Sequence, residues 1–148
     1  MDKPRTRQRN HKGATCQTIL SSALTEKLRR YIKEQNISLF VTLLATYKIL
    51  LYRYTGQHDL CVGVPAAGRP EQEFAEAIGY FINMLVMRSQ IDGNQPVSAF
   101  MEQLKWVVAE ALGHANYPFA KLVRTLEMSR DASHSPVFQA GLTLQSFS

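Results

Sequence analysis

The sequence predicts an α/β fold. Segments with the periodicity of amphipathic helices lie at residues 22–35 and 97–114, and a more uniformly apolar helical segment lies between them at residues 39–54. Apolar runs at residues 60–64 and 78–88 have the length and the branched or aromatic composition of buried strands. Because these segments share a chain of 148 residues, we expect one domain in which helices pack on a sheet.

Composition excludes several classes of protein. A hydrophobic share of 45% and a charged share of 20% are ordinary for a globular domain with a core. Cys16 and Cys61 lie far apart with no Cys-x-x-Cys pair, which indicates neither a disulfide framework nor a zinc site and favours a reducing, cytoplasmic setting. The apolar runs are too short and interrupted to span a bilayer, and no signal peptide is recognisable, so we expect no membrane partner.

The formal net charge of +5 comes mostly from residues 1–12, which hold five basic side chains and one acidic side chain. The rest of the chain is close to neutral, and residues 1–12 have no Phe, Tyr or Trp to stack on bases, so we expect no nucleic-acid partner. This stretch also carries Pro4 and shows no periodicity. We interpret it as a basic linker or tail that precedes one domain at residues 13–148.

In chain order, residues 13–20 are predicted as a short strand. Ser21 or Ser22 can cap the first helix, which runs to about residue 35. Ser38 is placed to cap the second helix, residues 39–54, which ends at a Thr-Gly pair. Because this second helix is apolar on nearly all sides, it must be largely buried, either in a core or against a partner.

In the middle of the chain, predicted strands alternate with stretches that interrupt regular secondary structure. Residues 60–64 suit a strand with both faces covered, and the Pro- and Gly-containing stretch at residues 65–70 predicts a loop. Residues 71–77 are expected to form about one helical turn before the strand at residues 78–88.

A long helix is predicted from Pro96 to about His114, with Trp106 beside its apolar stripe. Pro118 disfavours helix at the residue before it and then begins a short helix to about residue 127. After a polar, turn-like stretch at residues 128–135, residues 137–147 are predicted as a final strand.

Asn83 is the unexpected residue of the apolar run at residues 78–88. Its amide offers two donors and one carbonyl acceptor, and leaving them unpaired in an apolar interior costs about 1–3 kcal/mol. Either backbone groups of the fold satisfy the amide, which is usual for a lone buried Asn, or a ligand does so.

Four stretches carry a resemblance to a known family. They are L-L-Y-R-Y-T-G-Q-H-D-L-C-V-G-V-P-A-A-G-R within residues 39–69, I-G-Y-F-I-N-M-L-V-M-R at 78–88, H-A-N-Y-P-F-A at 114–120 and R-D-A-S-H-S-P-V-F-Q at 130–139. The first resembles a helix, strand and loop of the condensation domains of nonribosomal peptide synthetases. The others are similar to that family's G-x-F-V-N-T-x-x-x-R, H-Q-D-Y-P-F-E and R-D-x-S-R-N-P-L. The resemblance implies a C-terminal lobe with part of a chloramphenicol acetyltransferase-like fold, a mixed sheet and flanking helices.

The resemblance also implies a reaction. Condensation domains join carrier-protein-bound acyl or aminoacyl thioesters through an amide bond, and they depend on H-H-x-x-x-D-G in the N-terminal lobe. That motif does not occur in this sequence. We therefore expect a fragment or half of a condensation domain, truncated at its C-terminal end, inactive alone and without catalytic or metal-binding residues of its own.

The expected partners are an N-terminal condensation lobe, a peptidyl carrier protein and adjoining synthetase domains. No cofactor is expected to bind the chain directly, because phosphopantetheine would arrive on the carrier protein. The alternative is a stand-alone, non-catalytic module that binds a carrier protein or a synthetase.

By resemblance, Asn83 and Gly79 are the candidates for the substrate tunnel. Asn83 could donate to the oxygen that becomes negative when an amine attacks a thioester, but an amide cannot act as a general base. His114 and His134 stand in segments that the family uses to hold its fold, which argues against either as a substitute base. The residues expected to hold the structure are Arg88, Tyr117, Pro118, Phe119, Arg130 and Asp131.

Overall fold

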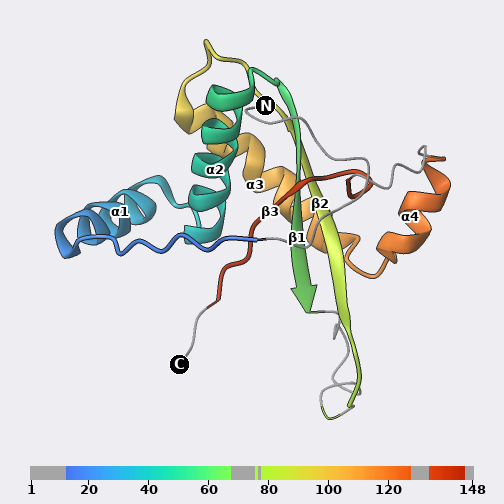
Figure 1. Ribbon diagram of the computed structural model, residues 1–148. Helices are drawn as coiled ribbons and strands as arrows, with labels where there is room; N and C mark the ends of the chain where they lie inside the picture. Colours follow the sequence, from blue (N-terminus) through green and yellow to red (C-terminus); the bar gives the residue numbers. More distant parts are fainter. Residues whose placement is uncertain (1–12, 68–75, 77, 128–133, 146–148) are drawn as a thin grey trace.

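The computed structural model describes residues 13–67, 76, 78–127 and 134–145 (Figure 1). Its elements are α1 (Ser22–Gln35), α2 (Leu39–Thr55), β1 (Asp59–Ala67), β2 (Ile82–Gln90), α3 (Val97–Gly113), α4 (Phe119–Thr125) and β3 (Ala140–Gly141). The strands form a mixed sheet in the order β2-β1-β3, with β1 antiparallel to β2 and parallel to β3. The prediction of an α/β fold with a mixed sheet is confirmed. The predicted linker at residues 1–12 lies outside the described residues.

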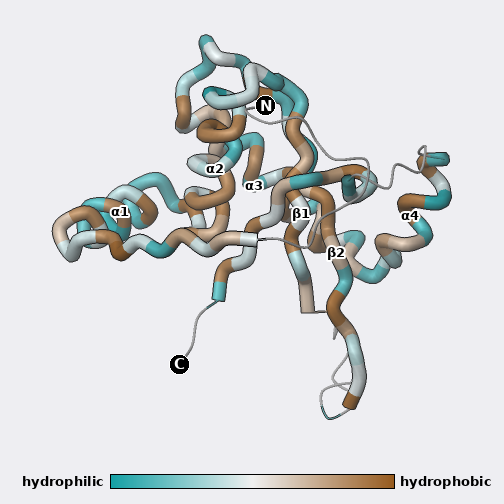
Figure 2. The backbone as a smooth tube through the Cα atoms, viewed as in Figure 1, coloured by the Kyte–Doolittle hydropathy of each residue, from teal (hydrophilic) through white to brown (hydrophobic). Residues whose placement is uncertain are grey.

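The core lies between the sheet and helices α2 and α3. Alternate residues of the paired strands, among them Val62 on β1 and Leu85 and Met87 on β2, are buried on this side, as a period of two requires. The helices contribute their apolar stripes, of which Leu44 and Phe100 are almost inaccessible to solvent. Figure 2 shows the apolar residues along both strands and along α2.

The predicted helix ends are confirmed where a cap defines them. The Ser21 hydroxyl accepts from the backbone N–H of Leu24 at 3.3 Å, and the Ser38 hydroxyl accepts from that of Val41 at 3.1 Å. Gly56 ends α2 with a φ of 68°, a left-handed conformation that glycine adopts without strain.

Helix α2 is less completely buried than its sequence predicts. Five of its residues are buried, namely Val41, Thr42, Leu44, Ala45 and Lys48, and the flank that includes Leu39, Leu50 and Tyr54 is exposed. Among the described residues, no single helix has the length and apolar composition to cross a membrane. Helices α1 and α2 reach that threshold only as a pair, and the pair is bent by 107°.

The predicted loop at residues 65–70 is wrong at its start, because Pro65 lies inside β1. A proline can stand there because β3 pairs only with Val62 and Gly63, so no ladder bond on that edge requires an N–H from Pro65. Residues 68–70 lie outside the described residues, as does nearly all of the turn predicted at 71–77.

One predicted strand is wrong, a second begins later than predicted and a third is shorter than predicted. Residues 13–20 are exposed and form no strand, since no described strand lies beside them. Strand β2 begins at Ile82 rather than at residue 78, because its partner β1 ends at Ala67, which pairs with Ile82. Of the final strand predicted at residues 137–147, the described part, residues 137–145, contains only the short strand Ala140–Gly141.

Candidate functional site

Asn83 lies on β2, on the side of the strand that faces the helices. Its Nδ2 donates to the carbonyl oxygens of Ala115 and Tyr117, both at 2.8 Å, and its Oδ1 accepts from the N–H of Phe119 at 3.0 Å. Both amide hydrogens are therefore used, and one lone pair of Oδ1 is left. Asn83 is half-buried, and of the two alternatives for its amide the structure shows satisfaction by backbone groups.

The groups that bind Asn83 belong to the junction between α3 and α4. Helix α3 ends at Gly113, and Pro118, with a φ of −65° and a ψ of 130°, is the residue before α4 rather than a residue of its first turn. A junction of this kind leaves backbone groups outside helical hydrogen bonds, and Asn83 satisfies three of them. The Tyr117 ring is substantially exposed and its hydroxyl lies 3.3 Å from the Thr125 hydroxyl, so this ring is not a core anchor.

Phe119 connects this junction to the side of the sheet that faces away from α2 and α3. Its ring packs against the ring of Phe138 with centroids 5.5 Å apart and an angle of 47° between planes. The Phe138 ring in turn lies on Gly63 of β1, so closely that a Cβ built on Gly63 would be 2.2 Å from the ring. Gly63 belongs to the first of the four stretches that resemble the family, and Asn83, Phe119 and Phe138 belong to the second, third and fourth. One connected set of contacts thus joins all four stretches.

Arg88 forms an ion pair with Asp59 on the solvent-exposed surface of the β1–β2 pair. Its Nη2 lies 2.6 Å from Asp59 Oδ2, and its Nε donates to both carboxylate oxygens at 3.0 and 3.2 Å. The hydrogen bonds and positive charge of Arg88 lower the pKa of Asp59. Both side chains are well exposed to water, so the pair orients the strand ends more than it stabilises the fold.

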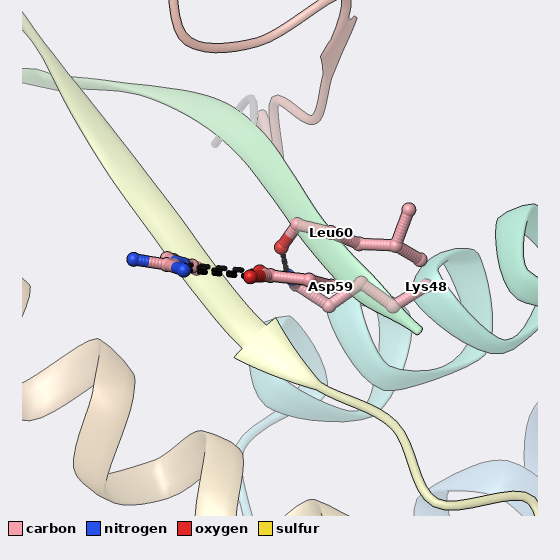
Figure 3. Close-up of polar contacts among 4 residues, drawn as sticks. Lys48, Asp59 and Leu60 are labelled. Atoms are coloured by element: carbon pink, nitrogen blue, oxygen red, sulfur yellow. Dashed lines mark hydrogen bonds and ion pairs between the residues drawn. The ribbon is translucent and has the colours of Figure 1, made fainter. Parts of the chain in front are cut away.

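The residue that the sequence analysis missed is Lys48. Its side chain is completely buried, and its Nζ donates to the carbonyl oxygen of Leu60 at 2.8 Å and to that of Met87 at 2.7 Å. Figure 3 shows Lys48 extending to Leu60, with Asp59 beside it. Desolvation lowers the pKa of Lys48 to about 8, and the nearby Cys61 and Asp59 offset this in part. A buried cation therefore ties α2 to both strands of the β1–β2 pair.

The sequence does contain a signal for Lys48. It lies seven residues after Val41, four after Leu44 and three after Ala45, which are all buried, so helical periodicity places its side chain on the same inward face. A lysine on the buried face of an apolar helix needs carbonyl or carboxylate partners. This periodicity is the signal that could have identified Lys48.

Gly79, the second tunnel candidate, precedes β2 and is exposed. A Cβ at Gly79 would approach only the end of the Phe81 side chain, at 3.1 Å. The neighbouring Ile78 and Tyr80 are 104% and 85% exposed, so this segment offers apolar side chains to solvent. Arg130 and Asp131 lie outside the described residues.

A groove of about 610 Å³ opens between the start of α2, the end of α3, β1 and the residues after β3. Its lining is apolar apart from two hydroxyl side chains, and it contains no charged residue. The lining residues are Ser38, Phe40, Val64, Pro65, Ala66, Ala67, Leu85, Met87, Val108, Leu112, Ala115, Thr143 and Leu144. A groove of this size and composition suits an apolar group.

The described residues hold no metal ligand set. Within residues 13–67, 76, 78–127 and 134–145, no group of three or more His, Cys, Asp or Glu side chains could bind a metal ion. His114 and His134 lie in different segments, after α3 and before β3. The described contacts position backbone groups of the helix junction, and the groove can bind apolar surface.

Comparisons with known proteins agree with this geometry. The family model for the condensation domain matches residues 1–148. Over 146 residues the chain is 42% identical to polyketide synthase PksN of Bacillus subtilis (strain 168) and 36% identical to bacitracin synthase 3 of Bacillus licheniformis; the alignments cover 99% of this chain and 3% and 2% of those proteins. The solved structure of holo-AB3403, a four-domain nonribosomal peptide synthetase bound to AMP and glycine, is similar with a TM-score of 0.93 and 28% identity, over 97% of this chain and 11% of that one. The chain thus spans only a few per cent of the length of these curated relatives.

Proposed function

This chain belongs to the condensation-domain family of nonribosomal peptide synthetases, and we propose that it serves as the C-terminal lobe of such a domain. The family forms amide bonds. In our proposal this lobe positions the acceptor side of the reaction, while an N-terminal lobe with H-H-x-x-x-D-G provides the histidine that assists the attacking amine. The observation that carries the proposal is the contact set from Asn83 through Phe119 and Phe138 to Gly63, which joins distant resembling stretches.

We propose Asn83 and Gly79 as residues near the substrate tunnel of the assembled domain. Because both hydrogens of the Asn83 amide are used on the carbonyls of Ala115 and Tyr117, the residue has no donor left for a developing oxyanion. The remaining lone pair of Oδ1 can accept a hydrogen bond from an attacking amine. Asn83 would then orient the acceptor nitrogen rather than stabilise the tetrahedral intermediate.

The proposed partners are the N-terminal lobe, a peptidyl carrier protein that delivers its substrate on phosphopantetheine, and adjoining synthetase domains. Support comes from the relatives, which are large synthases of which the chain matches a small part. No described group of this chain is proposed to hold a cofactor.

The test is complementation. Residues 1–148 are mixed with carrier-bound donor and acceptor thioesters, with or without an N-terminal lobe that carries H-H-x-x-x-D-G, and the amide product is measured by mass spectrometry. We expect product only in the mixture with the lobe, and none when the second His of its motif is changed to Ala. Turnover by residues 1–148 alone would show that this chain contains its own catalytic machinery.

A non-catalytic binding module is the second candidate, and the exposed apolar segment before β2 favours it. Ile78 and Tyr80 present apolar side chains that are available to a partner protein. Binding of a monodisperse, cooperatively unfolding chain to a phosphopantetheine-loaded carrier protein, with no product after the lobe is added, would support this candidate. Product formation on addition of the lobe would contradict it.

A further inference from the structure

We propose that the outer face of α3 binds a partner protein through an arginine side chain of that partner, which stacks on Trp106 and pairs with Glu110. The proposal goes beyond the proposed function, because neither Asn83 nor an N-terminal lobe enters it. The outer face is defined by a row of exposed residues, namely Ala99, Glu102, Gln103, Trp106, Glu110 and Gly113.

The outer face lies opposite the buried face of α3. Helix α3 packs against α2 and β2 through its buried residues, which are Phe100, Met101, Leu104 and Val108. With about 3.6 residues per turn, Trp106 lies on the side of the helix that is opposite these four. Glu102 and Glu110 stand four positions before and after Trp106, so both carboxylates are its neighbours on the helix surface.

Trp106 is placed to meet a partner rather than to stabilise the lobe. Its side chain is 73% exposed. Among the described residues, its ring has no aromatic or cationic neighbour and its indole N–H has no hydrogen-bond partner. Tryptophan has the aromatic ring that attracts cations most strongly, and it is enriched among the residues that dominate binding between proteins.

Glu110 stands in an unfavourable place for the helix itself. It lies in the last turn of α3, where the helix dipole is negative, and this turn holds no basic side chain. Glu102 pairs with Lys105 at 3.1 Å, whereas no described side chain forms an ion pair with Glu110. A cation that arrives from outside would therefore interact favourably with both the Glu110 carboxylate and the end of the helix.

An arginine matches these two groups better than other side chains do. Its planar guanidinium can stack on an indole ring and donate two parallel hydrogen bonds to a carboxylate, whereas lysine offers a compact point charge. A second copy of this chain fits poorly. Two α3 helices packed antiparallel about Trp106 would bring Glu102 against Glu110, and parallel packing would bring Glu110 against Glu110, so like charges meet in both cases.

Titration of the 148-residue chain with tetra-arginine amide, followed by NMR, tests the proposal. Trp106 is the only tryptophan of the chain, so its indole N–H gives a single cross-peak that reports on this face. We expect a saturable shift of that cross-peak, with an affinity about threefold higher for tetra-arginine than for tetra-lysine amide. An unchanged cross-peak, or equal affinities for the two peptides, would overturn the proposal.

Replacement of Glu110 separates a specific pair from general charge attraction. Glu110→Gln should weaken the binding of tetra-arginine amide by about threefold. Glu26→Gln is the matched control, because Glu26 is exposed on α1 and its replacement changes the net charge of the chain by the same amount. Equal affinities of these two variants would show that only net charge attracts the peptide, which contradicts the proposal.

Two further measurements test the ring and the identity of the partner. Trp106→Leu, followed through the backbone N–H of Gly113, should bind tetra-arginine amide about threefold more weakly than the unchanged chain. Unchanged affinity in this variant would exclude stacking on the indole. The indole cross-peak of the unchanged chain should keep its position on dilution without peptide, and a shift would show that copies of the chain cover this face in place of a basic partner.

Discussion

Replacement of Lys48 by Met tests whether Lys48 is a buried, desolvated cation in the folded chain. Met has a similar length and no charge, so Lys48→Met removes two hydrogen bonds to backbone carbonyls and also removes the desolvation of an ammonium group. These effects oppose each other at neutral pH, where Lys48 is charged in both the folded and the unfolded chain. The pH dependence of the free energy of unfolding separates the desolvation of the ammonium group from the loss of the two hydrogen bonds.

The pKa of Lys48 is about 8 in the folded chain, against an ordinary value of 10.5. Between these values the unfolded chain binds more protons than the folded chain, so the free energy of unfolding rises with pH. Linkage gives a gain of about 1.3 kcal/mol from pH 7 to 9 and about 2.5 kcal/mol from pH 7 to 10. Lys48→Met lacks this gain.

Urea unfolding of both chains, followed by circular dichroism at pH 7, 8, 9 and 10, measures the difference. The stability of the unchanged chain relative to Lys48→Met should increase steadily above pH 7. Lys27→Met is the control, because Lys27 lies exposed on α1 and its replacement should leave the pH dependence as it was. A difference between the unchanged chain and Lys48→Met that stays constant from pH 7 to 10 would refute the assignment of Lys48 as a desolvated cation.

Three other predictions concern single contacts. Asn83→Ala should lower the free energy of unfolding in urea by about 3 kcal/mol, at about 1 kcal/mol for each of three hydrogen bonds, and a loss below about 1 kcal/mol would contradict its role in the helix junction. Arg88 lowers the pKa of Asp59, so the ion pair stabilises the fold above the pKa of Asp59 in the folded chain and is lost as pH falls through that pKa. Asp59→Asn should therefore make the free energy of unfolding less dependent on pH in acid, and urea unfolding of both chains from pH 6 to 2 measures this. Phe100→Ala should cost about 3–5 kcal/mol in thermal or urea unfolding, whereas Trp106→Ala, at a position 73% exposed on the same helix, should change stability by less than about 0.5 kcal/mol.

The helices could be predicted closely because their ends are set by capping residues that lie next to them in the sequence. Ser21, Ser38 and Gly56 cap α1 and α2 through groups that lie a few residues away in the chain. Strand ends depend on partners elsewhere, and the sequence does not state the register. Strand β2 begins at Ile82 because Ala67 ends β1 opposite it, so the apolar residues 78–81 remain outside the strand.

The prediction for the C-terminal segment failed for a different physical reason. Its alternation predicts a strand, but the turn at Val137 directs Phe138 onto Gly63 and leaves only Ala140–Gly141 to pair with β1. The missing side chain of Gly63 is the cause, and its partner lies 75 positions away in the chain.

For Asn83, the resemblance and the structure give different kinds of information. The resemblance gave the residue a place near substrate, and the apolar run around it made an amide conspicuous, but neither could say which atoms the amide meets. Its two donors hold the carbonyls of Ala115 and Tyr117, so any contact with substrate must use the remaining lone pair of Oδ1. Asn83→Asp retains that oxygen and the acceptor for Phe119 but removes both donors, and it places a negative charge against two carbonyl oxygens. If Asn83 acts by holding the junction, this substitution should be as damaging to stability as Asn83→Ala at neutral pH and should recover in part at acid pH, where the protonated acid can donate to one carbonyl.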